Sequence, residues 1–294
     1  MHVIPEITVL YPEESRRPVM LRWRLFVLLV FFAHSTFGQW LNYPTPGTPR
    51  TRDGKPDLSA KAPRAPGGKP DLSGVWRTEP EVPGKNSTVF DVPGDNPSTF
   101  SRYFSNILAD FKNPEEIVRP EAAELVRKWR SAYNSPGYQC LPLSIPSADI
   151  FSYSPFKIIQ APGEMVILYE VDNTHRQIYL DGRKLPKDPQ PTWLGYSVGR
   201  WEGDTLVVDT AGFNDNSQAT LGGYPRSEAL HIEERFHRRD FGHMDLQLTV
   251  DDPKIFLKPI TIKVTELLEP DSDVLEMICN ENAEKDRPHL PISK

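Results

Sequence analysis

Apolar and polar residues alternate along the second half of the chain, from residue 155 to about residue 285. Turn residues such as Asp181 with Gly182 separate the alternating stretches. Short links between successive strands require antiparallel pairing, and a sheet this long removes its exposed edges by closing. The pattern predicts a mainly β domain over 155–285, an antiparallel up-and-down barrel or closed sandwich, followed by a tail at 286–294. The expected strands are FKIIQ, MVILYE, HRQIYL, GYSVGRW, TLVVDT, ALHIEERF, HMDLQLTV, ITIKVTELL and DVLEMIC.

Residues 70–154 lack this alternation, and we expect them to form a strand entry, loops and one helix packed on the barrel. The helix is predicted over 120–133, because Pro120 suits a first turn and Glu121 and Glu124 suit the positive end of the helix dipole. The N-terminal part of the domain is therefore expected to be irregular and partly helical. The buried stripe of this helix would contain Ala122, Leu125, Val126 and Trp129.

The phrase GKPDLS occurs twice, in DGKPDLSA at 53–60 and in GGKPDLSGVW at 67–76. The first copy lies within residues 39–69, and from residue 42 onward this segment is rich in Pro, Gly, Lys and Arg and has almost no apolar side chains. Because such a segment cannot bury enough surface to order itself, we predict a linker without fixed structure over 39–69. Only the second copy continues into Val75 and Trp76, so it is expected to lead a strand or turn into the core.

The segment MLRWRLFVLLVFFAHSTFGQW, which begins at Met20, has two arginines, an apolar run over 25–33 and then small residues. This order is typical of an export signal, and the run is too short to span a bilayer comfortably. We predict a signal peptide over 1–38, cleavage before Gln39 and a periplasmic or secreted product. A start at Met20 fits better than Met1, because Glu13 and Glu14 are unusual in a signal. The alternative is a membrane anchor; otherwise membrane contact is expected only before cleavage.

The charge balance argues against a nucleic-acid partner. The chain has 34 Lys and Arg against 40 Asp and Glu, a net charge of −6. Cleavage after residue 38 would remove four basic and three acidic residues, which leaves 30 against 37 and a net charge of about −7. Phosphate binding requires a basic face, and the sequence has no basic cluster.

The chain has two cysteines, Cys140 and Cys279. An even number of cysteines in an exported protein favours a disulfide, because the compartment is oxidising. We predict a bond between Cys140 and Cys279, which would tie the loop before the barrel to the last predicted strand. The alternative is a pair of buried free thiols.

Three charged residues occupy strand positions where the alternation predicts buried apolar side chains: Arg176, Glu234 and Glu266. An unpaired buried charge costs roughly several kcal/mol, so Arg176 is expected to form a bidentate pair with Glu234 or Glu266. Such a pair would be either a purely structural feature near the rim of the barrel or a polar anchor in a ligand cavity.

The functional hypothesis is an exported barrel that binds a small molecule of unknown identity. The expected ligand is apolar or aromatic and carries an anionic group, and no cofactor is expected. An aromatic wall could stack on such a ligand, although core packing is the alternative role for these rings. The predicted ligand-binding residues are two polar anchors and three aromatic residues: Arg176, Glu234, Tyr179, Trp193 and Tyr196.

An enzyme acting on a small molecule in the same cavity is the first alternative, with Glu234 or His231 as catalytic base. His231 and His237 share a strand face but would lie roughly 20 Å apart, so no metal site is expected. The pattern GYSVG around Ser197 matches a hydrolase nucleophile elbow, but the following sequence predicts a turn and a strand where that motif requires a helix. A structural envelope protein is the further alternative.

Four motifs resemble a family of exported bacterial proteins of unknown function: GKPDLSGVW, RQIYLDGR, GRWEGDTLVVDTAGFND and SEALHIEERFHRRDFGHMDLQLTVDDP. The resemblance covers most of the chain from Asp53 onward, and it implies no activity. A fainter resemblance is to the lipocalins, in which Gly-x-Trp stands on the first strand of a barrel, as Gly74 and Trp76 would here. The chain departs from that pattern by placing about 75 residues before the next clear strand.

Overall fold

The computed structural model describes residues 44–80, 101–130, 141–152, 154–214, 218–220 and 224–278. All of them belong to one compact unit, Pro44–Lys294, and the other unit of the chain is Met1–Tyr43. The predicted signal peptide, Cys140, Cys279 and the predicted tail lie outside the described residues. None of the helices in the described ranges has the length and apolar composition that a membrane crossing requires.

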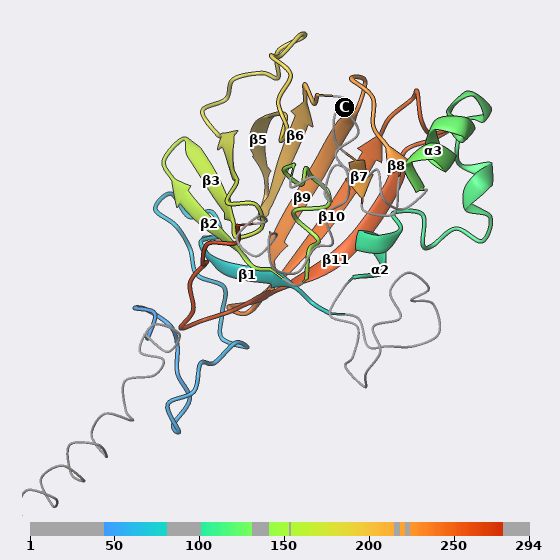
Figure 1. The fold of residues 1–294 in the computed structure, drawn as a ribbon. Helices are drawn as coiled ribbons and strands as arrows, with labels where there is room; N and C mark the ends of the chain where they lie inside the picture. Colours follow the sequence, from blue (N-terminus) through green and yellow to red (C-terminus); the bar gives the residue numbers. More distant parts are fainter. Residues whose placement is uncertain are drawn as a thin grey trace, which may run out of the picture. The chain divides into compact units, whose positions relative to one another are not determined.

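Nine strands within the described ranges form a closed barrel (Figure 1). Around the ring their order is β1, β11, β10, β9, β6, β5, β4, β3 and β2, and the short strands β7 and β8 pair with each other in a separate sheet. The closed ring confirms the predicted barrel. The bounds are β1 Gly74–Thr78, β2 Phe156–Ala161, β3 Glu164–Tyr169, β4 His175–Tyr179, β5 Tyr196–Glu202, β6 Thr205–Ala211, β7 Gln218–Thr220, β8 Tyr224–Pro225, β9 His231–Arg238, β10 His243–Asp251 and β11 Ile260–Leu268.

Strand β1 closes the ring between two strands that are distant in sequence. Trp76 lies opposite Leu268 of β11, and Gly74 lies opposite Ile158 of β2. A Cβ atom at Gly74, whose φ is +144°, would lie 2.5 Å from Leu268 Cδ1, so glycine is needed there. The buried Trp76 donates from Nε1 to the Leu72 carbonyl oxygen at 2.9 Å. The second GKPDLS copy therefore leads into the first barrel strand, as predicted.

Two strand predictions differ from the structure. Strands β4 and β5 are parallel, with Ile178 opposite Ser197, whereas the pattern predicted antiparallel pairs throughout. The physical reason is the link over 180–195, which is long enough to carry the chain back along the barrel before β5 begins. The stretch DVLEMIC forms no barrel strand up to residue 278, where Met277 makes only an isolated bridge to Val171.

Residues 44–69 are structured, which corrects the expectation of a linker without fixed structure over 39–69. The two GKPDLS copies form equivalent turns, because Thr51 N donates to Lys55 O and Ala65 N donates to Lys69 O, both at 2.9 Å. Proline and glycine favour such turns, and proline also lowers the entropy cost of ordering them. A large apolar surface is therefore not needed for this segment to fold.

Ion pairs attach both turns to distant parts of the unit. Arg50 lies 2.5 Å from Asp271, and Arg64 forms a bidentate pair with Asp204 through two hydrogen bonds of 2.7 Å. The side chain of Leu72, in the second copy, is completely buried. Local composition cannot show these contacts, because the acidic partners lie more than 100 residues further along the chain.

The predicted helix is confirmed over the described residues that it covers. It begins with a short 3₁₀ turn, η3 (Pro120–Ala122), and continues as α3 (Ala123–Arg130). Ala122 and Val126 are buried as expected, but Leu125 is 41% exposed, so the buried stripe is narrower than predicted. Two short elements precede it, α2 (Arg102–Ser105) and η2 (Pro114–Glu116).

The barrel core follows the strand alternation. Inward side chains of β10 are at most 1% exposed, which confirms the predicted core face: Met244, Leu246, Leu248 and Val250. The residues between them, including Asp245 and Gln247, are half-buried on the outward face. The same alternation places Glu234 of β9 inside the barrel and His231 outside.

Candidate functional site

A buried ion pair crosses the barrel interior. Arg176 of β4 donates from Nη1 to Glu234 Oε1 at 2.8 Å, and its Nη2 donates to Glu234 Oε2. The guanidinium also donates to Ser197 Oγ at 3.0 Å and to Thr210 Oγ1 at 2.8 Å. The predicted bidentate pair is therefore present, with Glu234 rather than Glu266 as the partner.

Strand register assembles this site from four strands that follow one another around the ring. Arg176, Ser197, Thr210 and Glu234 come from β4, β5, β6 and β9. Ser197 lies opposite Thr210, and their hydroxyl oxygens are 2.9 Å apart. Burial alone would lower the pKa of the Arg176 guanidinium, but the Glu234 carboxylate outweighs this effect, so the pKa is raised and Arg176 stays charged.

Asp149, which the strand pattern did not identify, is the third charged member of the interior. It lies in the irregular segment over 141–152 and accepts a hydrogen bond from the Tyr169 hydroxyl at 2.6 Å. Its Oδ2 lies 3.9 Å from Arg176 Nη1. Burial and the nearby Glu234 carboxylate raise the pKa of Asp149 from its ordinary 3.8 to about 7.

Glu266 of β11 is the fourth member, and its surroundings indicate that it is protonated. Thr78 Oγ1 lies 3.0 Å from Glu266 Oε1 and 3.0 Å from the Asp149 carbonyl oxygen. A hydroxyl has one proton to donate, and a carbonyl oxygen can only accept it. Both hydrogen bonds are satisfied together when the Glu266 carboxyl donates to Thr78. Burial raises the pKa of Glu266 well above its ordinary value, which agrees with this assignment.

We call Asp149, Arg176, Glu234 and Glu266 the interior cluster. Each member is at most 2% exposed, and the members contact one another or neighbouring hydroxyl groups. The arrangement satisfies four of the five N–H groups of the guanidinium. The cluster therefore joins strands and loop across the barrel, while Asp149 Oδ2 and Glu266 Oε2 are buried without a hydrogen-bond partner among the described residues.

The predicted aromatic residues do not join the interior cluster. Tyr179 and Tyr196 lie together on the outward face of the barrel, with ring centroids 5.2 Å apart, and Arg183 covers the Tyr179 ring. Alternation explains this correction, because residues an odd number of positions from an inward residue point outward. Trp193 is half-buried before β5, where its carbonyl oxygen accepts a hydrogen bond from Ser144 Oγ at 2.6 Å.

His231 cannot act with Glu234 in one cavity, because the two lie on opposite faces of β9. Its Nε2 is 3.2 Å from Asp209 Oδ1 on the outward surface. Ser197 lies within strand β5 and is buried, with its hydroxyl bonded to Arg176, so it does not form a nucleophile elbow. The described residues contain no group of three His, Cys, Asp or Glu side chains that could hold a metal ion.

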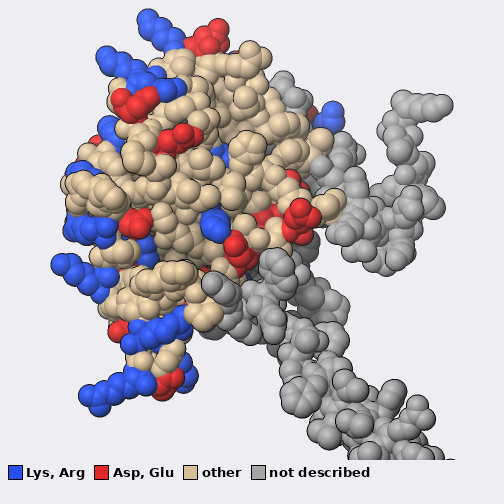
Figure 2. Space-filling model, turned by 90° about the vertical axis from the view of Figure 1, so that its left-hand side faces the viewer, with Lys and Arg blue, Asp and Glu red and all other residues tan. Residues whose placement is uncertain are grey.

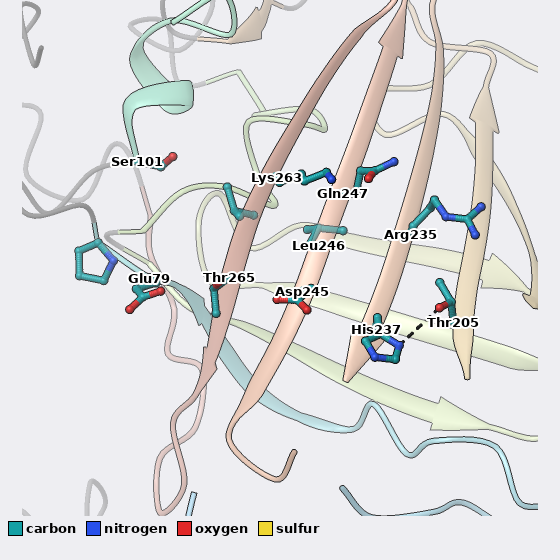
Figure 3. A pocket seen from close by; sticks show the side chains of 12 residues that line it. Glu79, Ser101, Thr205, Arg235, His237, Asp245, Leu246, Gln247, Lys263 and Thr265 are labelled. Carbon is teal, nitrogen blue, oxygen red and sulfur yellow. Dashed lines mark hydrogen bonds between the residues drawn. The ribbon is translucent and has the colours of Figure 1, made fainter. Parts of the chain in front are cut away.

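A pocket of about 640 Å³ lies on the outward face of β9, β10 and β11, and we call it the outer pocket (Figure 3). One row of its lining residues runs across neighbouring strands, because Gln247 lies opposite both Arg235 and Lys263. Sequence reasoning missed this site, since the row depends on the exact register of three strands. The outward positions of the alternation were the available signal.

A second row lies two residues away, later in β9 and β11 and earlier in the antiparallel strand β10. Asp245 lies opposite both His237 and Thr265. At the ends of this row, Thr205 Oγ1 is 3.4 Å from His237 Nδ1, and Glu79 N donates to the Thr265 carbonyl oxygen at 2.7 Å. Both rows line the outer pocket, so its wall presents basic and amide groups beside acidic and hydroxyl groups (Figure 3).

Comparisons with protein-family models, with curated proteins and with solved structures find no match to this chain. The class that the fold and the site define is a closed, mainly β barrel with a buried ionic cluster and a polar pocket on its outer wall.

Proposed function

We propose that the protein is an exported β-barrel that binds a small molecule in the outer pocket. The outer pocket carries this proposal, because its volume of about 640 Å³ falls within the range of small-molecule sites. Several polar side chains converge on it from neighbouring strands, as in sites that orient a ligand. The pocket thus replaces the barrel interior as the proposed location of the ligand.

The interior cluster is better explained as a structural element. Arg176 and Glu234 are bonded to each other and to buried hydroxyl groups, so neither presents a free polar group to a ligand. Breaking such a pair to admit a molecule would leave buried charges without partners, which is strongly unfavourable. The geometry gives no support to Glu234 or His231 as a catalytic base in a shared cavity.

Export and the type of partner are further parts of the proposal. The signal-like pattern over residues 20–39 supports a periplasmic or secreted location. The net charge of −6 disfavours nucleic acid. Figure 2 shows one face of the molecule, on which acidic and basic side chains are interspersed and no continuous basic surface forms.

A blocking variant tests the location of the ligand. Gln247→Trp places a large ring between Arg235 and Lys263 in the outer pocket. Thr261→Trp is the matched control, because Thr261 is exposed on β11 outside the pocket lining. Exported protein should be purified under native conditions, and a library of small metabolites should be screened by thermal shift.

We expect that compounds which raise the melting temperature of the wild type also raise that of Thr261→Trp but not that of Gln247→Trp. A ligand that stabilises both tryptophan variants equally would show that it binds elsewhere. A screen in which no compound shifts the wild type would count against a binding function and favour the structural alternative.

A further inference from the structure

The two rows of the outer pocket differ in the groups that they offer to a ligand. The first row consists of Arg235, Gln247 and Lys263, and the second includes Asp245 and Thr265. Neighbouring rows on one face of a strand are separated by two residues, or about 6.8 Å along the strand. A ligand that contacts both rows must therefore carry two kinds of polar group at opposite ends.

Lys263 is the cation of the first row that can accept a ligand. Arg235 is already engaged, since its Nη2 donates to Glu202 Oε2 at 2.8 Å. Within the described residues, Lys263 has no ion pair, and its side chain is exposed beside Gln247. One ammonium group and one amide suit a single carboxylate, whereas a phosphate dianion usually recruits several cationic or backbone donors.

Apart from the His237 ring, which lies opposite Asp245, the second row offers hydrogen-bond acceptors, and none of the Lys or Arg residues that line the pocket belongs to it. Thr265 contributes a hydroxyl, and Asp245 contributes a carboxylate that Arg239 contacts at 3.2 Å through one oxygen. Glu79, beside Thr265, adds another carboxylate without an ion pair among the described residues. Ligand hydroxyl groups are the donors that such a row can bind. An α-amino acid does not fit both rows, because its ammonium and carboxylate are attached to the same carbon atom.

We infer that the outer pocket binds a hydroxylated organic acid of the sugar-acid type, with its carboxylate at Lys263 and Gln247 and its hydroxyl groups at Asp245 and Thr265. This inference rests on the proposed function and specifies its ligand class. It keeps the anionic group expected from the sequence, and it replaces the apolar or aromatic body with a polar one.

Isothermal titration calorimetry with three probes tests the ligand class. Glucuronate carries both kinds of group, glucose lacks the carboxylate, and cyclohexanecarboxylate lacks the hydroxyl groups. We expect glucuronate to bind the wild type at least about tenfold more tightly than either control compound, because only glucuronate engages both rows.

Two variants assign the two ends of the ligand. In Lys263→Gln, glucuronate should bind no more tightly than glucose. In Thr265→Val, the difference in affinity between glucuronate and cyclohexanecarboxylate should become smaller. The matched controls are Lys258→Gln and Thr261→Val, which change the same residue types outside the pocket lining and should leave all three affinities unchanged.

Equal affinity of glucuronate and cyclohexanecarboxylate would overturn the inference, as would glucuronate binding that Lys263→Gln leaves intact. Failure of all three probes to bind would also overturn it. The proposed function would survive each of these results if another compound loses binding in Gln247→Trp. It would fail if no compound depends on the outer pocket.

Discussion

Arg176 Nη1 donates a hydrogen bond of 2.8 Å to Glu234 Oε1, although the two residues are 58 positions apart and their strands are not neighbours in the ring. Strands β5 and β6 lie between β4 and β9. The pair therefore connects strands that no backbone hydrogen bond joins. Both side chains are at most 2% exposed, so solvent screens this interaction only weakly.

Removal of either partner of this pair should destabilise the barrel strongly. We expect Arg176→Met or Glu234→Leu alone to lower the free energy of unfolding by about 3–5 kcal/mol, because the remaining charge stays buried without its partner. The double variant should recover much of that loss, since the two apolar side chains can pack together. Urea unfolding of the wild type and the three variants at one common pH provides the measurement.

An outward ion pair provides the control for this experiment. Arg235 and Glu202 form a hydrogen-bonded pair of 2.8 Å, with side chains 32% and 43% exposed. We expect Glu202→Gln to change the free energy of unfolding by less than about 1 kcal/mol. If the single changes at Arg176 and Glu234 alter the free energy of unfolding as little as this control does, the buried pair contributes little to the stability of the barrel.

Strand alternation made the central pair predictable from the sequence. It showed that Arg176 and Glu234 occupy inward positions, and the cost of a buried charge then required a partner. The same rule would have placed Tyr179 outside the barrel, because it lies three residues after Arg176 on one strand. Tyr179 and Tyr196 therefore lie together on the outward face and away from Arg176.

The remaining features depend on contacts that local patterns do not contain. Asp149 lies in an irregular segment, and its position is set by Tyr169 and by the barrel interior. The parallel pair of β4 and β5 follows from the path of the link over 180–195, which the residue pattern leaves open. Gln247 lines the outer pocket only because the register brings Arg235 and Lys263 beside it.

The stability of the barrel should depend on pH through Asp149. Its pKa is raised from 3.8 to about 7, so between these values the folded chain holds a proton that the unfolded chain releases. The contribution of Asp149 to stability is therefore fully present below pH 3.8 and is lost as the pH rises towards 7. We expect the free energy of unfolding to fall across this window, as measured by urea titrations at several pH values.

Asp149→Asn provides the test of this assignment, because an amide resembles the protonated carboxyl and cannot titrate. In this variant the free energy of unfolding should depend much less on pH over the same window. Above pH 7 the variant should be more stable than the wild type. The other titratable groups close to Asp149 are Tyr169, Arg176, Glu234 and Glu266. An unchanged pH dependence of the free energy of unfolding in Asp149→Asn would assign the effect to another group.

Glu266, whose pKa is also raised, should cause a further fall in the free energy of unfolding as the pH rises. Glu266→Gln should remove this additional fall.

Oxidation of Cys140 with Cys279 is a third prediction, and the described residues beside them support it. Leu143 N donates to Asp172 Oδ2 at 2.8 Å, and Met277 N donates to Asn173 Oδ1 at 3.2 Å. Residues close to both cysteines in the sequence therefore contact the same turn between β3 and β4. A bond that closes a loop of more than 100 residues is expected to stabilise the fold by about 4–5 kcal/mol before strain is considered.

Peptide mapping of exported protein without reduction should find Cys140 and Cys279 in one linked fragment. Cys279→Ser should lower the melting temperature by a similar amount to Cys140→Ser, and the double variant should add nothing further. Free thiols at both positions in the exported protein would contradict the bond.

The last prediction concerns export. The apolar run over 25–33 follows two arginines and precedes small residues, so we expect removal of residues 1–38 and a product that begins at Gln39. Leu28→Arg should block processing, because a charge in the centre of the run opposes its insertion into the bilayer. Leu41→Arg is the control, since it adds the same charge after the cleavage position and should leave processing intact. N-terminal sequencing and fractionation provide the measurements. Full-length wild-type protein that requires detergent for extraction would contradict cleavage and favour a membrane anchor.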